Sequence, residues 1–142
     1  AASDVYTRQS QLRRLDEMAA ARARLTERYD QLLASLPLKL PVRIHDRTSA
    51  WHLYAIEIDT SCTDATRKYV FQALRDAQIG VNVHYIPIHT QPHYQRLGFQ
   101  RGDFPDAEHY YANAISLPLF PAMTDQQQDR VVYVLAQALD CP

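Results

Sequence analysis

One stretch of the chain, from Gly80 to Phe99, holds most of the side chains that are suited to chemistry. Alternating apolar residues from Val81 to Tyr85 predict a short, half-buried strand, and Pro87 ends it because proline cannot donate to a strand ladder. Imidazole and phenol groups therefore gather at the end of a strand, where a rigid scaffold can direct them at a ligand. The alternative is a loop whose tyrosines pack and whose histidines are solvated. The groups concerned belong to His84, Tyr85, His89, His93 and Tyr94.

The histidines of this stretch also have a spacing that metal sites use. His84, His89 and His93 follow the pattern H-x4-H-x3-H, and two histidines four apart can share a zinc ion on one helical face. Pro92 lies between the last two, so a regular helix is not expected there. The closest carboxylate in the following sequence is Asp103. A zinc protein is therefore kept only as a third, weaker alternative.

No residue of the sequence is marked as a catalytic nucleophile. Cys62 lies at a helix start without a partner in the sequence, and Ser116 lies inside a predicted strand. Of the two lysines, Lys39 lies in a connector and Lys68 on a solvated helix face, and neither is expected to form a Schiff base. Both Cys62 and Cys141 are expected to be free thiols in a reducing cytoplasm.

Length, composition and charge restrict the class of protein. The chain has 142 residues, of which 46% are apolar and 22% charged, as in one soluble globular domain with a modest core. A net charge of −1 gives no electrostatic basis for a nucleic-acid partner. No apolar run approaches the roughly 20 residues that a membrane-spanning helix needs, so no membrane partner is expected. With only three glycines, a glycine-rich phosphate loop is excluded.

A helix of unusual length is predicted near the N-terminus. Residues 1–8 show no pattern, but from Gln9 to about Leu36 apolar residues recur with a helical period until Pro37. Such a helix has about 27 residues and a length of roughly 40 Å, more than twice the usual length. A domain of this size cannot cover both ends of it. Part of its apolar face is therefore expected to contact something outside the small domain.

The remaining sequence predicts an α+β fold. Its order is long helix, β, α, β, short helix, β, α, which gives about three strands with helices packed mainly on one face. The central strand is expected at Trp51–Ile58 and an edge strand at Ala114–Leu119, and residues 37–50 form a connector with at most a short strand. Helices are expected over residues 64–78, 105–113 and 124–139, the last with a capping box formed by Thr124 and Gln127.

Several segments together resemble one protein family. The quoted stretches are VHYIPIHTQPHYQRLGF (83–99), GDFPDAEHYYANAISLPLFPAMTDQQQDRVV (102–132), the helix at 10–33 and WHLYAIEID (51–59). They are similar to the C-terminal domain of the DegT/DnrJ/EryC1/StrS sugar aminotransferases, over about residues 10–138. Within the family the resemblance is closest to the transaminase that makes the UDP-linked 4-amino sugar of the pseudaminic acid pathway.

The resemblance implies a pyridoxal phosphate enzyme of polysaccharide biosynthesis. Such an enzyme is a fold-type I homodimer that moves an amino group, usually from glutamate, onto the 4-keto carbon of a nucleotide-linked sugar. Residues 1–36 would then be the N-terminus and the interdomain helix, and residues 37–142 the small C-terminal domain. The large domain, with its cofactor lysine, would be absent. We therefore expect no catalytic, cofactor-binding or metal-binding residue in this chain, and no activity of the chain alone.

The resemblance also implies a substrate-binding role for three residues. By match to the H-Y-x-P motif, His84 and Tyr85 would face the sugar-nucleotide cleft, with His89 in the following loop. Imidazole and phenol groups can hydrogen-bond the oxygens of sugars and phosphates. The alternative function is a stand-alone binding or dimerisation module that pairs through the long helix. Self-association through exposed leucines of that helix is expected in either case.

Overall fold

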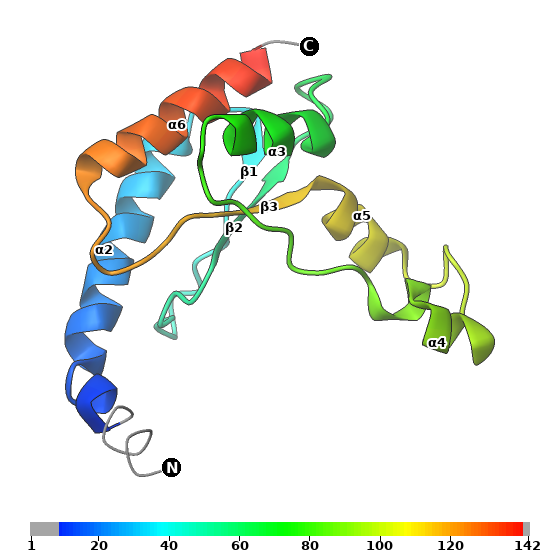
Figure 1. Cartoon of the computed structure of the whole chain (residues 1–142), viewed down its shortest axis with the longest axis horizontal. Coiled ribbons are helices and arrows are strands. Elements are labelled where there is room, and N and C mark those ends of the chain that lie inside the picture. Colours follow the sequence, from blue (N-terminus) through cyan, green and yellow to red (C-terminus); the bar gives the residue numbers. More distant parts are fainter. Residues whose placement is uncertain (1–8, 141–142) are drawn as a thin grey trace.

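The computed structural model describes residues 9–140, which form a small twisted sheet with helices beside it (Figure 1). Within these residues the sheet has three antiparallel strands in the order β1-β2-β3. The strands are β1 (Leu38–Lys39), β2 (Tyr54–Ile58) and β3 (Ala114–Leu117). The helices are α2 (Leu15–Leu33), α3 (Arg67–Asp76), the 3-10 helix η1 (Ile88–Thr90), α4 (Pro92–Arg96), α5 (Pro105–Asn113) and α6 (Asp125–Asp140). This confirms the predicted α+β class.

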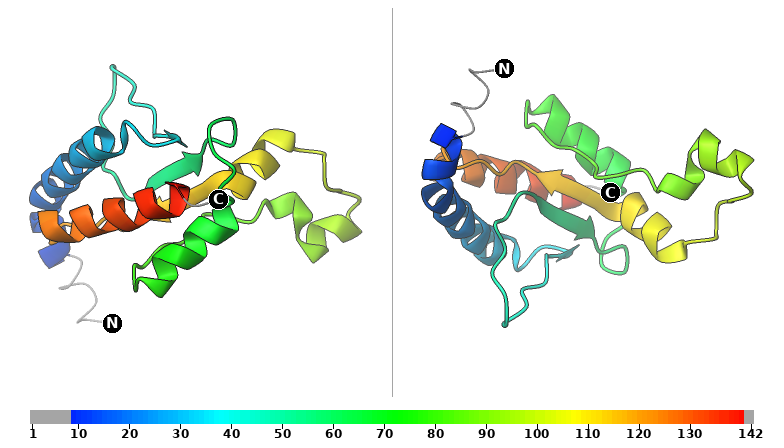
Figure 2. Two further views of the ribbon diagram at one scale, coloured as in Figure 1. Left: turned by 90° about the horizontal axis from the view of Figure 1, so that it is seen from above. Right: turned by 90° about the horizontal axis from the view of Figure 1, so that it is seen from below.

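The hydrophobic core lies on one face of the sheet. Strand side chains alternate between the two faces, and Tyr54 pairs with Leu117 and Ile56 with Ile115, so these four share a face. All four are almost fully buried, in one cluster with apolar residues of α2, α3 and α6. Burying each such side chain contributes about 1.5–3 kcal/mol. Helices α3 and α6 pack side by side there (Figures 1 and 2).

The other face of the sheet carries different residues. By the same alternation, Ala55, Glu57 and Ser116 point away from the core. Ala55 and Glu57 are only half-buried. The sheet therefore has one closed face, which holds the fold together, and one more open face.

Helix α2 runs beside α6 and is shorter than predicted. Residues 9–13 are also helical, but a turn at Arg14 separates them from the 19 residues of α2. Its C-terminal half is held in the core by Leu25, Tyr29 and Leu33, each 0% exposed. The other half is uncovered, since Leu15 is 50% exposed and the preceding Leu12 69% exposed. The small domain thus leaves part of the apolar stripe free.

The predicted strand at Val81–Tyr85 is wrong. This segment contacts β3 through a single bridge between Asn82 and Ser116, and the third strand of the sheet is β1 instead. The register of this bridge places Gly80 opposite Pro118, which has no N–H to donate, and Tyr85 opposite Asn113, the last residue of α5. Little of β3 is therefore left for the segment to pair with, and pairing stops after one bridge. As predicted, β2 is central and β3 lies at an edge.

The starts of α6 and α4 agree with the sequence predictions. The capping box is confirmed, since Gln127 N–H donates to Thr124 Oγ1 at 3.2 Å and Thr124 N–H to Gln127 Oε1 at 2.9 Å. As predicted, no regular helix runs from His89 to His93, since η1 ends at Thr90 and Pro92 begins the separate helix α4, where its missing N–H is not needed. Among the described residues, no helix is both long and apolar enough to cross a membrane.

A projecting segment, residues 85–104, leaves the sheet and returns to it through α5; we call it the arm. It contains η1 and α4, and it extends from the body on the side away from α2 (Figures 1 and 2). Several of its apolar side chains are exposed, among them Tyr85, Ile88 and Leu97. The arm begins at the residues that the sequence marks as substrate-binding.

Candidate functional site

His84 lies over the open face of the sheet and is held by a serine. The backbone groups of Asn82 and Ser116 bond each other twice, at 3.2 and 2.8 Å, which fixes the register of the segment against β3. His84 follows two residues later, so its side chain lies diagonally across from Ser116. Its Nδ1 atom is 2.8 Å from Ser116 Oγ. Ser116 is 5% exposed and His84 half-buried, so the hydroxyl is enclosed while part of the imidazole reaches solvent.

Tyr85 stands next to His84 and is open to solvent. The two rings lie edge to face, with centroids 4.6 Å apart and an interplanar angle of 84°. Tyr85 is 73% exposed, which is unusual for a tyrosine that only packs. The structure thus brings together two of the three predicted substrate-binding residues. Side by side they offer an imidazole and a phenol, both of which form hydrogen bonds to oxygen.

His89 belongs to a different cluster, at the junction of the arm with α5. It is 7% exposed, its Nε2 atom is 2.8 Å from Glu108 Oε1, and the ring of Phe104 packs at 4.8 Å. The same oxygen accepts a hydrogen bond from Gly102 N–H at 2.6 Å. That donor, and then the imidazole, hold the pKa of Glu108 below its usual range. An ionised carboxylate therefore ties two ends of the arm together.

The three histidines of the zinc pattern have separate surroundings. His84 contacts Ser116, His89 contacts Glu108, and His93 is exposed on α4 with its ring 5.3 Å from that of Tyr94. Within residues 9–140, no three histidine, cysteine, aspartate or glutamate side chains lie close enough to share a metal ion. The H-x4-H-x3-H spacing therefore does not assemble a metal centre in this part of the chain.

Neither lysine of the chain lies in a site that suits a Schiff base. Lys39 is exposed on the edge strand β1, and Lys68 is exposed in the first turn of α3. A cofactor lysine needs a desolvated pocket and, for pyridoxal phosphate, a partner for the ring nitrogen. The described residues do not fit this cofactor by themselves. Cys62 is an exposed free thiol, and Cys141 lies outside the described residues.

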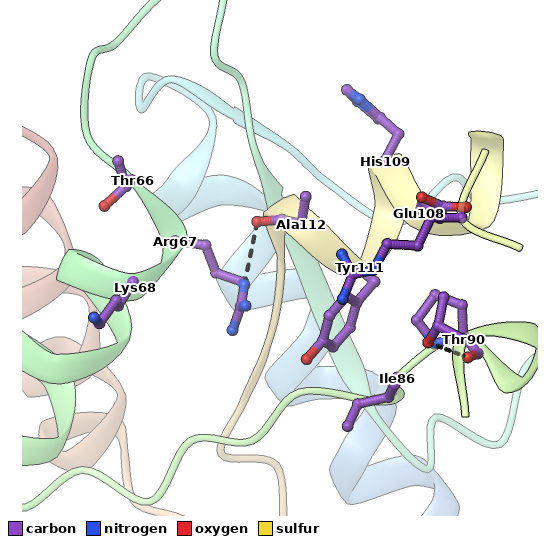
Figure 3. Close-up of a pocket in the computed structure, with 11 residues that line it drawn as sticks. Thr66, Arg67, Lys68, Ile86, Thr90, Glu108, His109, Tyr111 and Ala112 are labelled. Carbon is purple, nitrogen blue, oxygen red and sulfur yellow. Dashed lines mark hydrogen bonds between the residues drawn. The ribbon is translucent and has the colours of Figure 1, made fainter. Parts of the chain in front are cut away.

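An open cleft adjoins the His84–Tyr85 pair along the chain, because the next residues, Ile86 and Pro87, line it (Figure 3). Its other walls are the start of α3 and the last two turns of α5. Arg67 and Tyr111 project into it. It is more polar than the shallow apolar groove further along the arm, which Ile88, Phe99 and Phe104 help to line.

Ser116 is the residue of this site that sequence reasoning missed. From the sequence it was placed inside a predicted strand and was given no role. The signal was present, because Ile115 and Leu117 are core residues and the strand period turns Ser116 to the opposite face. A single polar residue between two apolar ones in a buried strand faces a second environment, which here contains His84.

This small domain, a three-stranded antiparallel sheet with helices on one face, also occurs in solved sugar aminotransferases. Spr1654 of Streptococcus pneumoniae, described as a sugar aminotransferase and solved in its PLP form, matches 93% of this chain with a TM-score of 0.84 at 26% identity. The chain covers 34% of that protein. PseC of Helicobacter pylori, an aminotransferase of pseudaminic acid biosynthesis, matches 93% of the chain with a TM-score of 0.79, and the chain covers 35% of it. At 24% identity, this second likeness shows the fold alone.

The family follows from the sequence comparison. The model of the DegT/DnrJ/EryC1/StrS aminotransferase family matches residues 7–136, so the chain belongs to this family. SpsC of Bacillus subtilis, a spore coat polysaccharide biosynthesis protein, is 39% identical over 125 residues. These residues are 86% of this chain and 32% of SpsC. The chain therefore spans about a third of the length of the relatives it matches.

Proposed function

We propose that the chain is the C-terminal domain of a sugar aminotransferase that uses pyridoxal phosphate to move an amino group from glutamate to the 4-keto carbon of a nucleotide-linked sugar. Membership of the family supports amino transfer, and the polysaccharide role of SpsC supports a sugar substrate. The proposed division is residues 1–36 as N-terminus and interdomain helix, and residues 37–142 as the small domain. The remaining two thirds of the enzyme would be a large domain.

The observation that carries this proposal is the placement of His84 over the open face of the sheet, in contact with Ser116, with the exposed ring of Tyr85 beside it. The closed face is filled by the core, so the open face is where a large domain and a substrate have room. In this proposal His84 and Tyr85 form one wall of the sugar-nucleotide cleft. His89 supports that wall from behind, since its imidazole is buried against Glu108.

Ser116 would orient His84 for this role. Its hydroxyl is able either to donate to Nδ1 or to accept from it, so the contact survives in both protonation states of the imidazole. When the hydroxyl donates, the proton of the neutral ring lies on Nε2, which is then a donor for a sugar or phosphate oxygen. The ring is thereby positioned without being given a fixed charge.

The cofactor would come with the large domain. Bound pyridoxal phosphate supplies an electron sink for the carbon that loses its proton. The residues of this chain would bind and orient the sugar nucleotide and exclude water from one side of the cleft. The chain alone would therefore have no aminotransferase activity.

A fusion protein tests the proposal. The chain is joined, at the start of α2, to the large domain of a relative such as SpsC, and the 142-residue chain alone serves as the control. The fusion is expected to show the visible absorbance of bound pyridoxal phosphate and glutamate-dependent amination of a UDP-linked 4-keto sugar. Turnover by the chain alone would contradict the proposal, as would a folded, cofactor-loaded fusion that does not turn over.

A homo-oligomer is also proposed, and the exposed half of the N-terminal helical region favours it. Leu12 and Leu15 of this region are 69% and 50% exposed. In the alternative function, a stand-alone dimerisation module, the same surface would be the whole interface. Light scattering of the chain is expected to show self-association that Leu12→Gln with Leu15→Gln abolishes. A wild-type monomer at high concentration would contradict self-association.

A further inference from the structure

One face of α2 continues beyond the part of the helix that the small domain covers. At intervals of three or four, which place side chains on the same side of a helix, this face carries residues 15, 18, 22, 25, 29 and 33. The last three are fully buried in the core, Met18 and Arg22 are half-buried, and Leu15 is 50% exposed. In Figure 1 the N-terminal half of α2 extends away from the sheet and from α6. The face therefore leaves the core and ends in solvent.

Arg22 lies on this face where the cover of the small domain ends. Its Nε atom is buried and has no hydrogen-bond partner among the described residues, and its guanidinium group forms no ion pair with any residue from 9 to 140. Two arginines further along α2 differ in this respect, since Arg24 and Arg28 bond the carboxylates of Asp125 and Asp129 at 3.0 and 2.7 Å. A buried donor without a partner is costly. A carboxylate from outside the small domain would therefore be a favourable partner for Arg22.

A second copy of the chain offers such a carboxylate. Asp16 lies in the first turn of α2, is exposed, and forms no ion pair with another residue in the described part of the chain. The neighbouring Glu17 is already 3.6 Å from Arg14. Within one helix Asp16 and Arg22 are six residues apart, so they are not neighbours on its surface. Between two antiparallel copies of α2 they can be neighbours, because the two chains run in opposite directions.

We propose that this face is an interface between two copies of the chain, whose α2 helices pair antiparallel so that Arg22 of each copy binds Asp16 of the other. The two-fold axis then passes Ala19, which lies midway between these residues, and its small side chain lets the helices approach closely. Leu15 and Met18 of both copies bury apolar surface in the contact. The opposite charges at its two ends are complementary. The pairing rests on the self-association proposed above and adds its orientation and its ion pairs.

Exchanging the charges at the two positions tests the pairing in the 142-residue chain. Asp16→Arg brings two arginines together at each end of the dimer, and Arg22→Asp brings two aspartates together. Each variant is expected to dimerise at least about tenfold more weakly than the wild type, measured by sedimentation equilibrium, because two contacts per dimer become repulsive. The chain with both substitutions is expected to dimerise within about threefold of the wild type, because opposite charges face each other again.

A mixture of the two single variants tests whether the contact joins different chains. The Asp16→Arg and Arg22→Asp chains are each expected to be monomeric at a concentration at which their mixture forms a heterodimer, since both contacts of the heterodimer join opposite charges. Native mass spectrometry identifies the heterodimer, because the two chains differ in mass. An ion pair within one chain could not produce this result.

Glu17→Arg is the matched control, since it makes the same change of charge at the next exposed residue of the same turn. If the wild type dimerises, equal weakening by Asp16→Arg and Glu17→Arg, or a mixture without heterodimer, would overturn the pairing and retain self-association. A wild type that stays monomeric at high concentration would overturn both. Circular dichroism confirms that each variant is folded, and the comparison of Asp16→Arg with Glu17→Arg remains decisive if Arg22→Asp is not. The fusion enzyme tests amino transfer independently of these outcomes.

Discussion

Two histidines five residues apart, His84 and His89, are used in opposite ways. His84 contacts a hydroxyl, on the open face of the sheet, and keeps part of its ring in solvent. His89 contacts an ionised carboxylate and an aromatic ring, and it is 7% exposed. The comparison teaches that the partner of a histidine decides its role. A carboxylate in a buried cluster makes a structural tie, whereas a hydroxyl beneath an exposed ring leaves the ring free to bind.

Of the substitutions that test this comparison, the largest effect on stability is expected at His89. His89→Ala removes a buried ring and leaves Glu108 without its imidazole partner, so we expect a loss of roughly 2 kcal/mol in the free energy of unfolding, measured by urea titration. His93→Ala is the control, since His93 lies on α4 of the same arm but is exposed. If both substitutions cost the same, His89 does not tie the arm to α5.

The stability that Glu108 contributes through its contacts with His89 and Gly102 should depend on pH. Contacts with Gly102 N–H and His89 lower the pKa of Glu108 in the folded chain, so its contribution is fully present above its unfolded pKa of about 4.3. The contribution is lost as the pH falls through the lower folded value. The difference in urea midpoint between wild type and Glu108→Gln should therefore shrink between about pH 5 and pH 2. A difference that stays constant over this range would contradict an ionised tie.

A smaller effect on stability is expected when the contact between Ser116 and His84 is removed. Ser116→Ala removes the hydroxyl that contacts His84, at a cost of about 1 kcal/mol in stability. Nitrogen chemical shifts of the imidazole should move from a protonated Nε2 toward a mixture of tautomers, and Ser116→Thr should restore them. Thr26→Val, which removes another buried hydroxyl, is the control. Unchanged shifts in Ser116→Ala would show that the serine does not orient the ring.

The smallest effect on stability is expected at Tyr85. Because Tyr85 is 73% exposed, Tyr85→Phe should change the free energy of unfolding by less than about 0.5 kcal/mol. In the fusion enzyme the same substitution should raise KM for the sugar nucleotide about tenfold, since it removes one hydrogen bond to substrate. Tyr94→Phe on α4 should change neither quantity. A stability loss at Tyr85 with unchanged KM would assign it to packing.

Local patterns predicted the elements whose determinants are close in sequence. β2, α5 and the capping box of α6 were recovered because aromatic and branched runs, a proline at a helix start and a Thr–Gln pair act within a few residues. The segment at Val81–Tyr85 was mistaken for a strand, because the register of its one bridge puts Pro118 on one side and the end of α5 on the other. This limit lies in the partner segment, which the alternating pattern of the segment itself does not describe.

The geometry of the candidate site was predicted in part, and its role in substrate binding stays a prediction. His84 and Tyr85 were identified as neighbours, and the structure places their rings together. The partners that separate the roles of His84 and His89 were not predictable, because Ser116 and Glu108 lie 32 and 19 residues away in the sequence. The position of Arg67 against the end of α5 likewise depends on a contact across 45 residues. Long-range packing, which no short pattern encodes, sets these contacts.

The most direct test follows the two halves of the reaction separately in the fusion enzyme. Glutamate alone should remove the visible absorbance of bound pyridoxal phosphate, and the keto sugar nucleotide should restore it. The account predicts that His84→Ala with Tyr85→Phe leaves the glutamate half unchanged and slows the sugar half about tenfold or more at low substrate concentration. Equal slowing of both halves, or of neither, would contradict the claim that this domain forms one wall of the sugar-nucleotide cleft.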